Sequence, residues 1–437
     1  MKAGFFEKDV TPPVGTYLAG YPSRKSGSEG VDDPLFLRVV AMEDDAGERL
    51  VLVTADLLKF PKPMTWRLKA WAQRTLGLPS ASLIINLSHS HSSPGLFYQE
   101  CYPQWPLDID YICRFEQSIR EGIAGALDDL RPARATFGIH QEHFGVSRRL
   151  PDPAIGGKTR LGQNPEGYYD PDLPILAFYP KDGEQPRAIL YSYACHATWK
   201  SGQNISADWP GEVSRGLKRE LGDDVMTLFV QGAAGSVATR RDDRYGTPEA
   251  FSRVASGIAD FARSAAMRPL ELKLAAAETE FGIPYDQTKL LTADELLEFA
   301  DPADTDISPI IPYIRPANRS IVRLWAQHIY EWMRTDRLPT EFGMHLTRVR
   351  LADGVHIVAL SGEVTAQVGR MVKALFPDRD TLFFGYCSYT DAYIPAASML
   401  EEHGHEALQS IYFHVRPAPF VPEIDDIITR EVLALSP

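Results

Sequence analysis

Several short apolar runs along the chain end in polar residues that carry reactive groups. The run Leu83-Ile84-Ile85 predicts a buried strand and leads into residues 86–95, which contain His89 and His91. Runs at 187–193, 227–230, 356–360 and 382–386 predict further strands of this kind. Alternate residues of a strand share a face, so a regular strand would aim both histidines at one point. Because α/β proteins bind ligands at the carboxyl ends of strands, the pattern predicts a site there.

Segments with the apolar periodicity of helices lie between these strands. Apolar residues three or four apart predict helices over 61–76, 108–130 and 248–267, and another that ends near Leu221. Residues 151–173 are rich in Pro, Gly, Asn and Asp, which predicts a loop. Residues 284–340 are mostly polar, with helical signals at 293–299 and 320–333. We therefore expect an α/β fold of packed mixed sheets flanked by helices, as one large catalytic domain over 1–437 with a helical subregion at about 284–340.

Composition narrows the class of protein. The net charge of −13 over 437 residues argues against a nucleic-acid partner, and no basic run suggests an anionic membrane. No apolar run approaches the ~20 residues of a membrane helix, and the N-terminus lacks the pattern of a signal peptide. The four cysteines show no paired spacing, which fits reduced thiols. We expect a cytoplasmic protein that acts on a small molecule or a glycan; the sequence does not indicate an oligomeric state.

Five polar side chains share one placement in the pattern. His89, His91, His196, Glu363 and Tyr393 each follow an apolar strand. Two or three histidines with one carboxylate are a suitable ligand set for a catalytic zinc, which keeps one position open for water. Each residue alone also has a structural interpretation, as a loop histidine, a helix cap or a core tyrosine. The pattern by itself leaves both interpretations open.

At these positions the sequence resembles the catalytic domain of the neutral (non-lysosomal, alkaline) ceramidases. The family's T-H-T-H-S-G-P-G motif is matched by residues 88–95, and its histidine and D-Y-P-G motifs by 195–198 and 208–211. Ser361-Gly362-Glu363 matches a P/S-G-E motif, Tyr393-Ile394 the end of N-x-Y-x-x-Y-I, and Asp9-Val10-Thr11-Pro12 the N-terminal D-I/V-T-P element. The motifs follow the family's order between residues 4 and about 415.

The resemblance implies a role for each matched residue. It places the zinc ligands at His89, His196, Glu363 and Tyr393, with His91 facing the substrate. It places Arg148 at a substrate-contacting arginine and Gly20 in the loop near the substrate head group. His91, Arg148 and Tyr393 are then the expected catalytic residues, and Gly20, His91, Arg148 and His405 the expected substrate contacts. A turn after Ile85 would have to separate His89 from His91 for the two to divide these tasks.

Several departures from the family affect the expected chemistry. Gly232 stands where ceramidases have the serine once proposed as a nucleophile, and Ser236 replaces the aspartate of the same motif. Thr390 and His405 each replace a tyrosine, the second of which touches the substrate head group in the family. We also expect a protein without the family's C-terminal immunoglobulin-like domain and without a secretion signal. The resemblance is therefore to a divergent bacterial-type member, and we expect a substrate other than ceramide.

These observations lead to one main hypothesis and two alternatives. The main one is a zinc-dependent hydrolase in which metal-activated water attacks an amide (N-acyl) bond of a small polar or amphiphilic substrate. The first alternative is a metal-dependent enzyme that hydrolyses or eliminates a sugar or glycan linkage. The second is a ligand-binding protein without turnover.

Further side chains are candidates around this site. Asp56 and Asp208 could orient the imidazoles, or could be turn or cap residues. An aromatic loop and a set of arginines suggest a sugar-like or acidic ligand, or else core residues and a solvated face. The aromatic residues are Phe97, Tyr98, Tyr102 and Trp105, and the arginines are Arg148, Arg149, Arg240 and Arg241.

Overall fold

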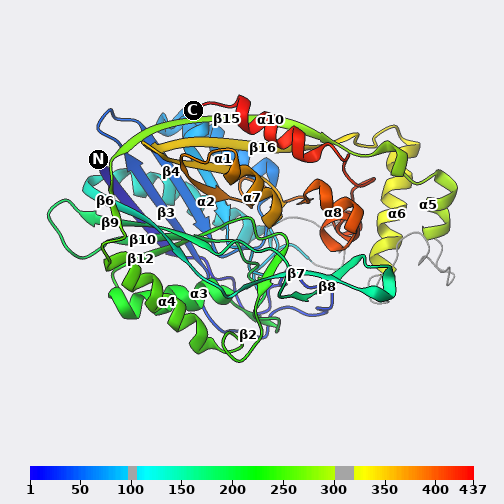
Figure 1. The fold of residues 1–437 in the computed structure, drawn as a ribbon, viewed down its shortest axis with the longest axis horizontal. Helices are drawn as coiled ribbons and strands as arrows, with labels where there is room; N and C mark the ends of the chain where they lie inside the picture. The colour runs from blue at the N-terminus through cyan, green and yellow to red at the C-terminus, as the bar shows by residue number, and fades with distance from the viewer. Residues whose placement is uncertain (97–105, 301–318) are drawn as a thin grey trace.

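Two mixed β-sheets packed face to face form the centre of the molecule (Figure 1). The computed structural model describes residues 1–96, 106–300 and 319–437. The larger sheet has the strand order β12 (Met226–Gln231), β10 (Ala188–Tyr193), β9 (Asp172–Pro180), β6 (Arg131–Gln141), β1 (Lys2–Asp9), β3 (Phe36–Glu43), β4 (Arg49–Ala55) and β5 (Leu83–Leu87), with β14 (Arg268–Leu270) paired to β6. The smaller has the order β15 (Leu272–Pro284), β16 (Glu341–Ala352), β17 (Val355–Leu360) and β19 (Asp380–Phe384).

Helices cover the outer faces of both sheets, as predicted. On the larger sheet, α1 (Lys62–Leu76) and α2 (Ile109–Asp128) pack on β3 to β5, and α3 (Asp208–Leu221) and α4 (Pro248–Arg263) pack on β9, β10 and β12. On the smaller sheet lie α7 (Ala366–Ala374) and α10 (Ile424–Ala434). Strands such as β17 are covered on both faces, with Ile357 toward the other sheet and Val358 toward the helices. That double burial explains why their sequences are continuous apolar runs.

The rim of the molecule carries shorter elements. Helices α5 (Ala293–Ala300) and α6 (Arg319–Arg334) lie where helices were predicted and pack together at one end (Figure 1). The small pairs are β2 (Gly30–Val31) with β11 (Asn204–Ile205) and β18 (Glu363–Val364) with β20 (Tyr393–Ile394). The C-terminal part adds α8 (Ala397–Glu402), the π-helical turn η5 (His405–Gln409) and α9 (Ser410–Phe413). None of the helices in the described residues has the length and apolar composition needed to cross a membrane.

The predicted loop at 151–173 is partly wrong. It contains β8 (Thr159–Asn164), which pairs with β7 (Gly145–Pro151), and β7 pairs in turn with β13 (Val237–Thr239). Strand β8 is mostly polar and partly exposed, so it lacks the apolar pattern by which strands are recognised. Its pairing depends on the backbone of β7 instead.

A buried asparagine joins the two edge strands of the larger sheet. The Asn86 amide at the end of β5 donates to the Gln231 carbonyl at the end of β12 (3.2 Å), and the Gln231 backbone N–H donates to Asn86 Oδ1 (2.8 Å). The same amide also donates to the Gly385 carbonyl just after β19 (2.7 Å). The carboxyl ends of β5, β12 and β19 are therefore brought to one place although they lie in two sheets.

A second buried contact fixes α1 against the smaller sheet. Lys69 is 2 % exposed and its Nζ lies 2.7 Å from Glu278 on β15, whose carboxylate is also 3.0 Å from His345 Nε2. His345 Nδ1 contacts Ser388 Oγ at 2.9 Å, which connects this cluster to the 385–393 segment. Burial alone would raise the pKa of Glu278, but His345 and Lys69 outweigh it and hold that pKa at about 2.

We expect Glu278→Gln to lower the free energy of unfolding by about 2 kcal/mol at pH 7, because it leaves the Lys69 ammonium buried beside a neutral partner. Since the Glu278 pKa is depressed, this contribution is present above the unfolded-state pKa of roughly 4.3 and is lost as pH falls toward 2. Urea unfolding of the wild type and the variant, at pH 7 and at about pH 2, measures the difference in their free energies of unfolding. Glu280→Gln is the matched control, because its partner Lys62 is exposed and the change should be within about 0.5 kcal/mol. Equal effects of the two substitutions would contradict the account.

Candidate metal centre

Three imidazoles meet at the carboxyl ends of the strands. His89 and His91 follow β5, and His196 follows β10. His89 Nε2 lies 3.2 Å from His91 Nε2, and one ring nitrogen from each of the three histidines lies within 4.8 Å of the others. His89 and His196 are buried, whereas His91 is partly exposed. The predicted convergence of the two strand-end motifs is therefore present.

Backbone carbonyls hold the opposite nitrogen of each ring. His89 Nδ1 lies 2.8 Å from the Leu58 oxygen, His91 Nδ1 3.1 Å from the Gly20 oxygen, and His196 Nδ1 2.7 Å from the Ala234 oxygen. A carbonyl oxygen only accepts hydrogen bonds, so the proton of each neutral ring belongs on Nδ1. The lone pair then lies on Nε2, which is the tautomer that metal-binding histidines adopt.

Burial keeps at least two of the rings neutral. It lowers the pKa of His196 to about 3 and the pKa of His91 well below its usual value; the positive charge of Arg148 acts in the same direction on both. Near neutral pH these two Nε2 atoms are therefore acceptors without a proton of their own.

The backbone after β5 explains how two histidines of one strand end reach the same point. The chain leaves regular strand geometry after Leu87, and His89 has φ of +62°, in the left-handed region that non-glycine residues rarely occupy. The turn that the sequence could not exclude is thus present. It nevertheless leaves the two Nε2 atoms adjacent instead of separating them. The predicted division of tasks between His89 and His91 stays a prediction.

Glu363 and Tyr393 complete the cluster from the segments that follow β17 and β19. They are paired directly in the short ladder of β18 and β20. Glu363 Oε2 lies 3.2 Å from His89 Nε2 and 3.5 Å from His196 Nε2, and the Tyr393 hydroxyl lies 3.3 Å from His196 Nε2. Burial alone would raise the pKa of Glu363, but His89, His196 and Lys59 outweigh it and hold that pKa well below its usual value.

Arg148 on β7 approaches the Tyr393 hydroxyl from the other side. Its Nη2 donates to that hydroxyl at 3.0 Å and its Nε donates to Glu406 at 2.9 Å. Burial raises the pKa of Tyr393 well above 10, and Arg148 opposes that rise by favouring the phenolate. Arg148 therefore lowers the cost of ionising a tyrosine that lies next to His196.

The separations within this cluster suit a zinc ion. Zinc–ligand bonds of about 2.0–2.1 Å in a tetrahedron give edges of about 3.3–3.4 Å between ligand atoms. Four of the separations between the imidazole, carboxylate and phenol atoms run from 3.2 to 3.5 Å. Glu363 Oε2 is buried and has no hydrogen-bond partner in the described residues, as expected for an oxygen that faces a cation. His89, His91, His196, Glu363 and Tyr393 are thus the residues that could hold a metal.

Sequence reasoning missed two residues behind Glu363. Lys59 Nζ and His414 Nε2 lie 3.7 and 3.8 Å from Glu363 Oε1, and Lys59 Nζ lies 3.0 Å from His414 Nδ1. They engage the carboxylate oxygen that faces away from the histidines. Lys59 follows the apolar residues after β4, which was a detectable signal. His414 follows α9 with no strand before it, so no pattern in the sequence indicated it.

The proposed orienting role of Asp56 and Asp208 is wrong. Asp56 accepts hydrogen bonds from Arg38 (3.1 Å) and the Phe36 amide (2.9 Å). Asp208 accepts from the backbone amides of Trp199, Lys200 and Trp209. The carbonyl oxygens described above occupy the positions that carboxylates would have needed. Neither carboxylate has an imidazole among these hydrogen-bond partners: Asp56 is paired with Arg38, and Asp208 binds backbone amides beside the start of α3.

Three of the four candidate arginines are engaged elsewhere in the protein. Arg149 forms ion pairs with Glu406 (2.7 Å) and Glu402 (2.9 Å), so it is neither a solvated residue nor free to bind an acidic ligand. Arg240 and Arg241 donate to backbone carbonyls. Arg148 alone of these reaches the metal centre. The aromatic loop residues Phe97, Tyr98, Tyr102 and Trp105 lie outside the described residues.

Gly20 and His405 both lie against residues of the centre. Gly20 has φ of +96°, and a Cβ there would come within 2.7 Å of the His91 ring, so only glycine fits. The His405 ring, on the π-helical turn, lies 5.1 Å from the Tyr393 ring. Their substrate contacts remain predictions.

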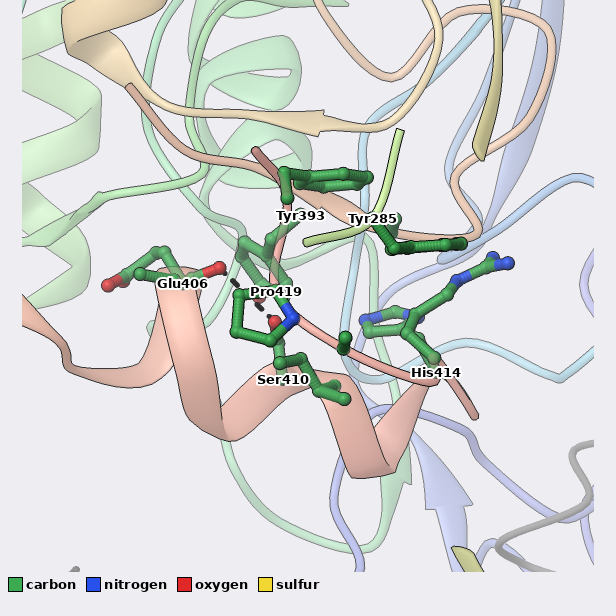
Figure 2. Close-up of a pocket in the computed structure, with 12 residues that line it drawn as sticks. Tyr285, Tyr393, Glu406, Ser410, His414 and Pro419 are labelled. Carbon is green, nitrogen blue, oxygen red and sulfur yellow. Dashed lines mark hydrogen bonds between the residues drawn. The ribbon is translucent and has the colours of Figure 1, made fainter. Parts of the chain in front are cut away.

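A small cavity adjoins Tyr393. Tyr285, Glu406, Ser410 and His414 line it together with Tyr393 (Figure 2). Its volume of about 10 Å³ is room for about one water molecule. The cavity is therefore too small to hold a substrate. His91 and Arg148 are partly exposed.

Solved structures with the same fold are found by comparison with known proteins. No protein-family model and no curated protein matches the sequence. Among solved structures, neutral ceramidase from Pseudomonas aeruginosa superposes with a TM-score of 0.71 at 16 % identity, over 99 % of this chain and 73 % of that one. A ceramidase complexed with C2 superposes with a TM-score of 0.72 at 16 % identity, over 99 % of this chain and 74 % of that one. The expected α/β architecture is thus confirmed, and the chain has the fold of the neutral ceramidases.

Proposed function

We propose that the protein is a metal-dependent hydrolase that cleaves an amide bond, with zinc as the metal. One observation carries the proposal: imidazole Nε2 atoms and one carboxylate oxygen lie 3.2–3.5 Å from one another, while Nδ1 of each ring lies against a backbone carbonyl. Lone pairs at such distances repel one another unless a cation lies among them. His89, His196, Glu363 and Tyr393 are the proposed ligands, with His91 beside them.

The fold supports the choice of reaction. The solved structures that share it are named as ceramidases, and ceramide is an N-acyl lipid whose cleavage breaks an amide bond. At 16 % identity the substrate itself does not transfer. We propose a small polar or amphiphilic N-acyl compound, because His405 stands beside Tyr393 where the family carries a head-group tyrosine.

Each residue has a task in this reaction. A zinc ion in the centre would polarise the substrate carbonyl and lower the pKa of water. Lys59 and His414 hold Oε1 of Glu363, so that Oε2 stays directed at the histidines. His91 is partly exposed and its neutral Nε2 can accept a proton from the attacking water and return it to the leaving nitrogen. Arg148 can donate to the carbonyl oxygen from its position beside Tyr393.

The serine motif of the family offers no nucleophile in this protein. Gly232 has no side chain, and the Ser236 hydroxyl is used at the start of α7, where it accepts from the Ala366 amide (3.1 Å) and donates to Gln367 (3.1 Å). Water is therefore the proposed nucleophile.

We expect His196→Ala to abolish zinc binding, with loss of at least 90 % of the metal per chain by elemental analysis, because it removes a buried ligand. His356→Ala is the matched control, since His356 is also buried but bonds Thr381 within β17 and the adjacent strand. The control should retain the wild-type metal content even if it loses stability. A metal-loaded His196→Ala protein would show that the ligand assignment is wrong.

We expect the zinc-loaded protein to release free amine from one or more members of an N-acyl amide panel, and a chelator such as 1,10-phenanthroline to remove that activity. Readdition of zinc should restore it, because the residues of the centre stay in place. A parallel glycan panel tests the alternative reaction. Glycan cleavage with every N-acyl compound left intact would overturn the amide assignment and keep the metal centre.

A further inference from the structure

Tyr386 lies in the metal centre with an unused hydroxyl. The residue is 1 % exposed, its ring centroid is 4.6 Å from that of His89 and 6.0 Å from that of His196, and its hydroxyl has no hydrogen-bond partner in the described residues. Buried hydroxyl groups without a partner are uncommon, because each loses its hydrogen bonds to water on folding. The unsatisfied donor of Tyr386 therefore requires an explanation.

The backbone of Tyr386 is also in an unfavourable conformation. Its φ is +55°, which an aromatic residue seldom adopts. The conformation is held from both sides, since the Tyr386 amide donates to the Gly362 carbonyl (3.1 Å) and Asn86 donates to the Gly385 carbonyl (2.7 Å). Strain of this kind is often kept at functional sites, where the surrounding structure imposes it.

An acceptor in the same centre is also unsatisfied. Glu363 Oε2 lacks a hydrogen-bond partner, yet Tyr386 does not bond to it. Glu363, Tyr393 and Arg148 all contribute to the electrostatic environment of the Tyr386 hydroxyl. A phenol is a hydrogen-bond donor at neutral pH. The proposed cation accounts for Glu363 Oε2, which leaves the Tyr386 hydroxyl to donate to an acceptor atom of a bound substrate.

We propose that Tyr386 is a further catalytic residue, whose hydroxyl donates a hydrogen bond to the carbonyl oxygen of the substrate. The inference rests on the proposed amide hydrolysis. In that reaction the water oxygen bonds to the carbonyl carbon, the carbon–nitrogen bond breaks, and the proton lost by water goes to the nitrogen. Tyr386 keeps its own proton and stabilises the negative charge that develops on the carbonyl oxygen.

The test is Tyr386→Phe in the zinc-loaded protein, since it removes only the hydroxyl. We expect unchanged zinc content and a dissociation constant for acetohydroxamate, measured by calorimetry, that rises about 10-fold for one lost hydrogen bond. On the best N-acyl substrate kcat should fall about 100-fold with little change in KM, because the bond strengthens in the transition state. Tyr389→Phe is the matched control, because the Tyr389 hydroxyl donates to the Gly343 carbonyl (2.8 Å), outside the centre. Its dissociation constant for acetohydroxamate and its kcat should both stay near the wild-type values.

Four outcomes would overturn the inference: wild-type acetohydroxamate affinity in Tyr386→Phe, loss of zinc from that variant, an equal effect of Tyr389→Phe, or a zinc-loaded wild type that binds no acetohydroxamate. The loss of zinc would mean that Tyr386 merely supports His89. A crystal structure of the wild-type complex tests the same contact without a variant, and should place the Tyr386 hydroxyl within about 3 Å of the probe's carbonyl oxygen. Failure of the proposed function is distinct, because there the wild type itself holds no zinc or cleaves no N-acyl compound.

Discussion

The convergence of buried lone pairs on one point is the constraint around which this structure is built. His91 and His196 are neutral near pH 7, their protons face backbone carbonyls, and Glu363 adds an anionic oxygen 3.2 Å from His89. In a protein interior such an arrangement is unfavourable without a cation, and favourable with one. The proposed metal therefore accounts for the stability of the cluster as well as for its reactivity.

The rest of the fold fixes the cluster from several directions. Asn86 and Gln231 join the two edges of the larger sheet, so that the loops after β5 and β10 lie beside each other. The β18–β20 ladder sets Glu363 next to Tyr393. Lys59 and His414 then hold the outer oxygen of Glu363. Ligands held by such surroundings keep their geometry without the metal, which reduces the reorganisation needed when it binds.

Much of the fold and of the candidate site was predictable from the local pattern of apolar and polar residues. Doubly covered strands such as β17 show continuous apolar runs, and polar residues at their ends mark His89, His196 and Glu363. Tyr393 follows an apolar run in the same way, and the family resemblance gave it the role of a ligand. What could not be predicted depends on contacts between distant segments. Backbone carbonyls, which have no sequence signature, orient the imidazoles in place of Asp56 and Asp208. Likewise, the pairing of Arg149 with Glu406 joins residues 257 positions apart.

The position of the metal itself is the most direct test of the central claim. We expect a crystal of the zinc-loaded protein to give one strong anomalous peak at the zinc absorption edge, about 2.0–2.2 Å from His89 Nε2, His196 Nε2 and Glu363 Oε2. Data collected below the edge should lose that peak. Contradiction would come from a fully zinc-loaded crystal with no peak among these atoms, in which water molecules bridge the imidazoles instead.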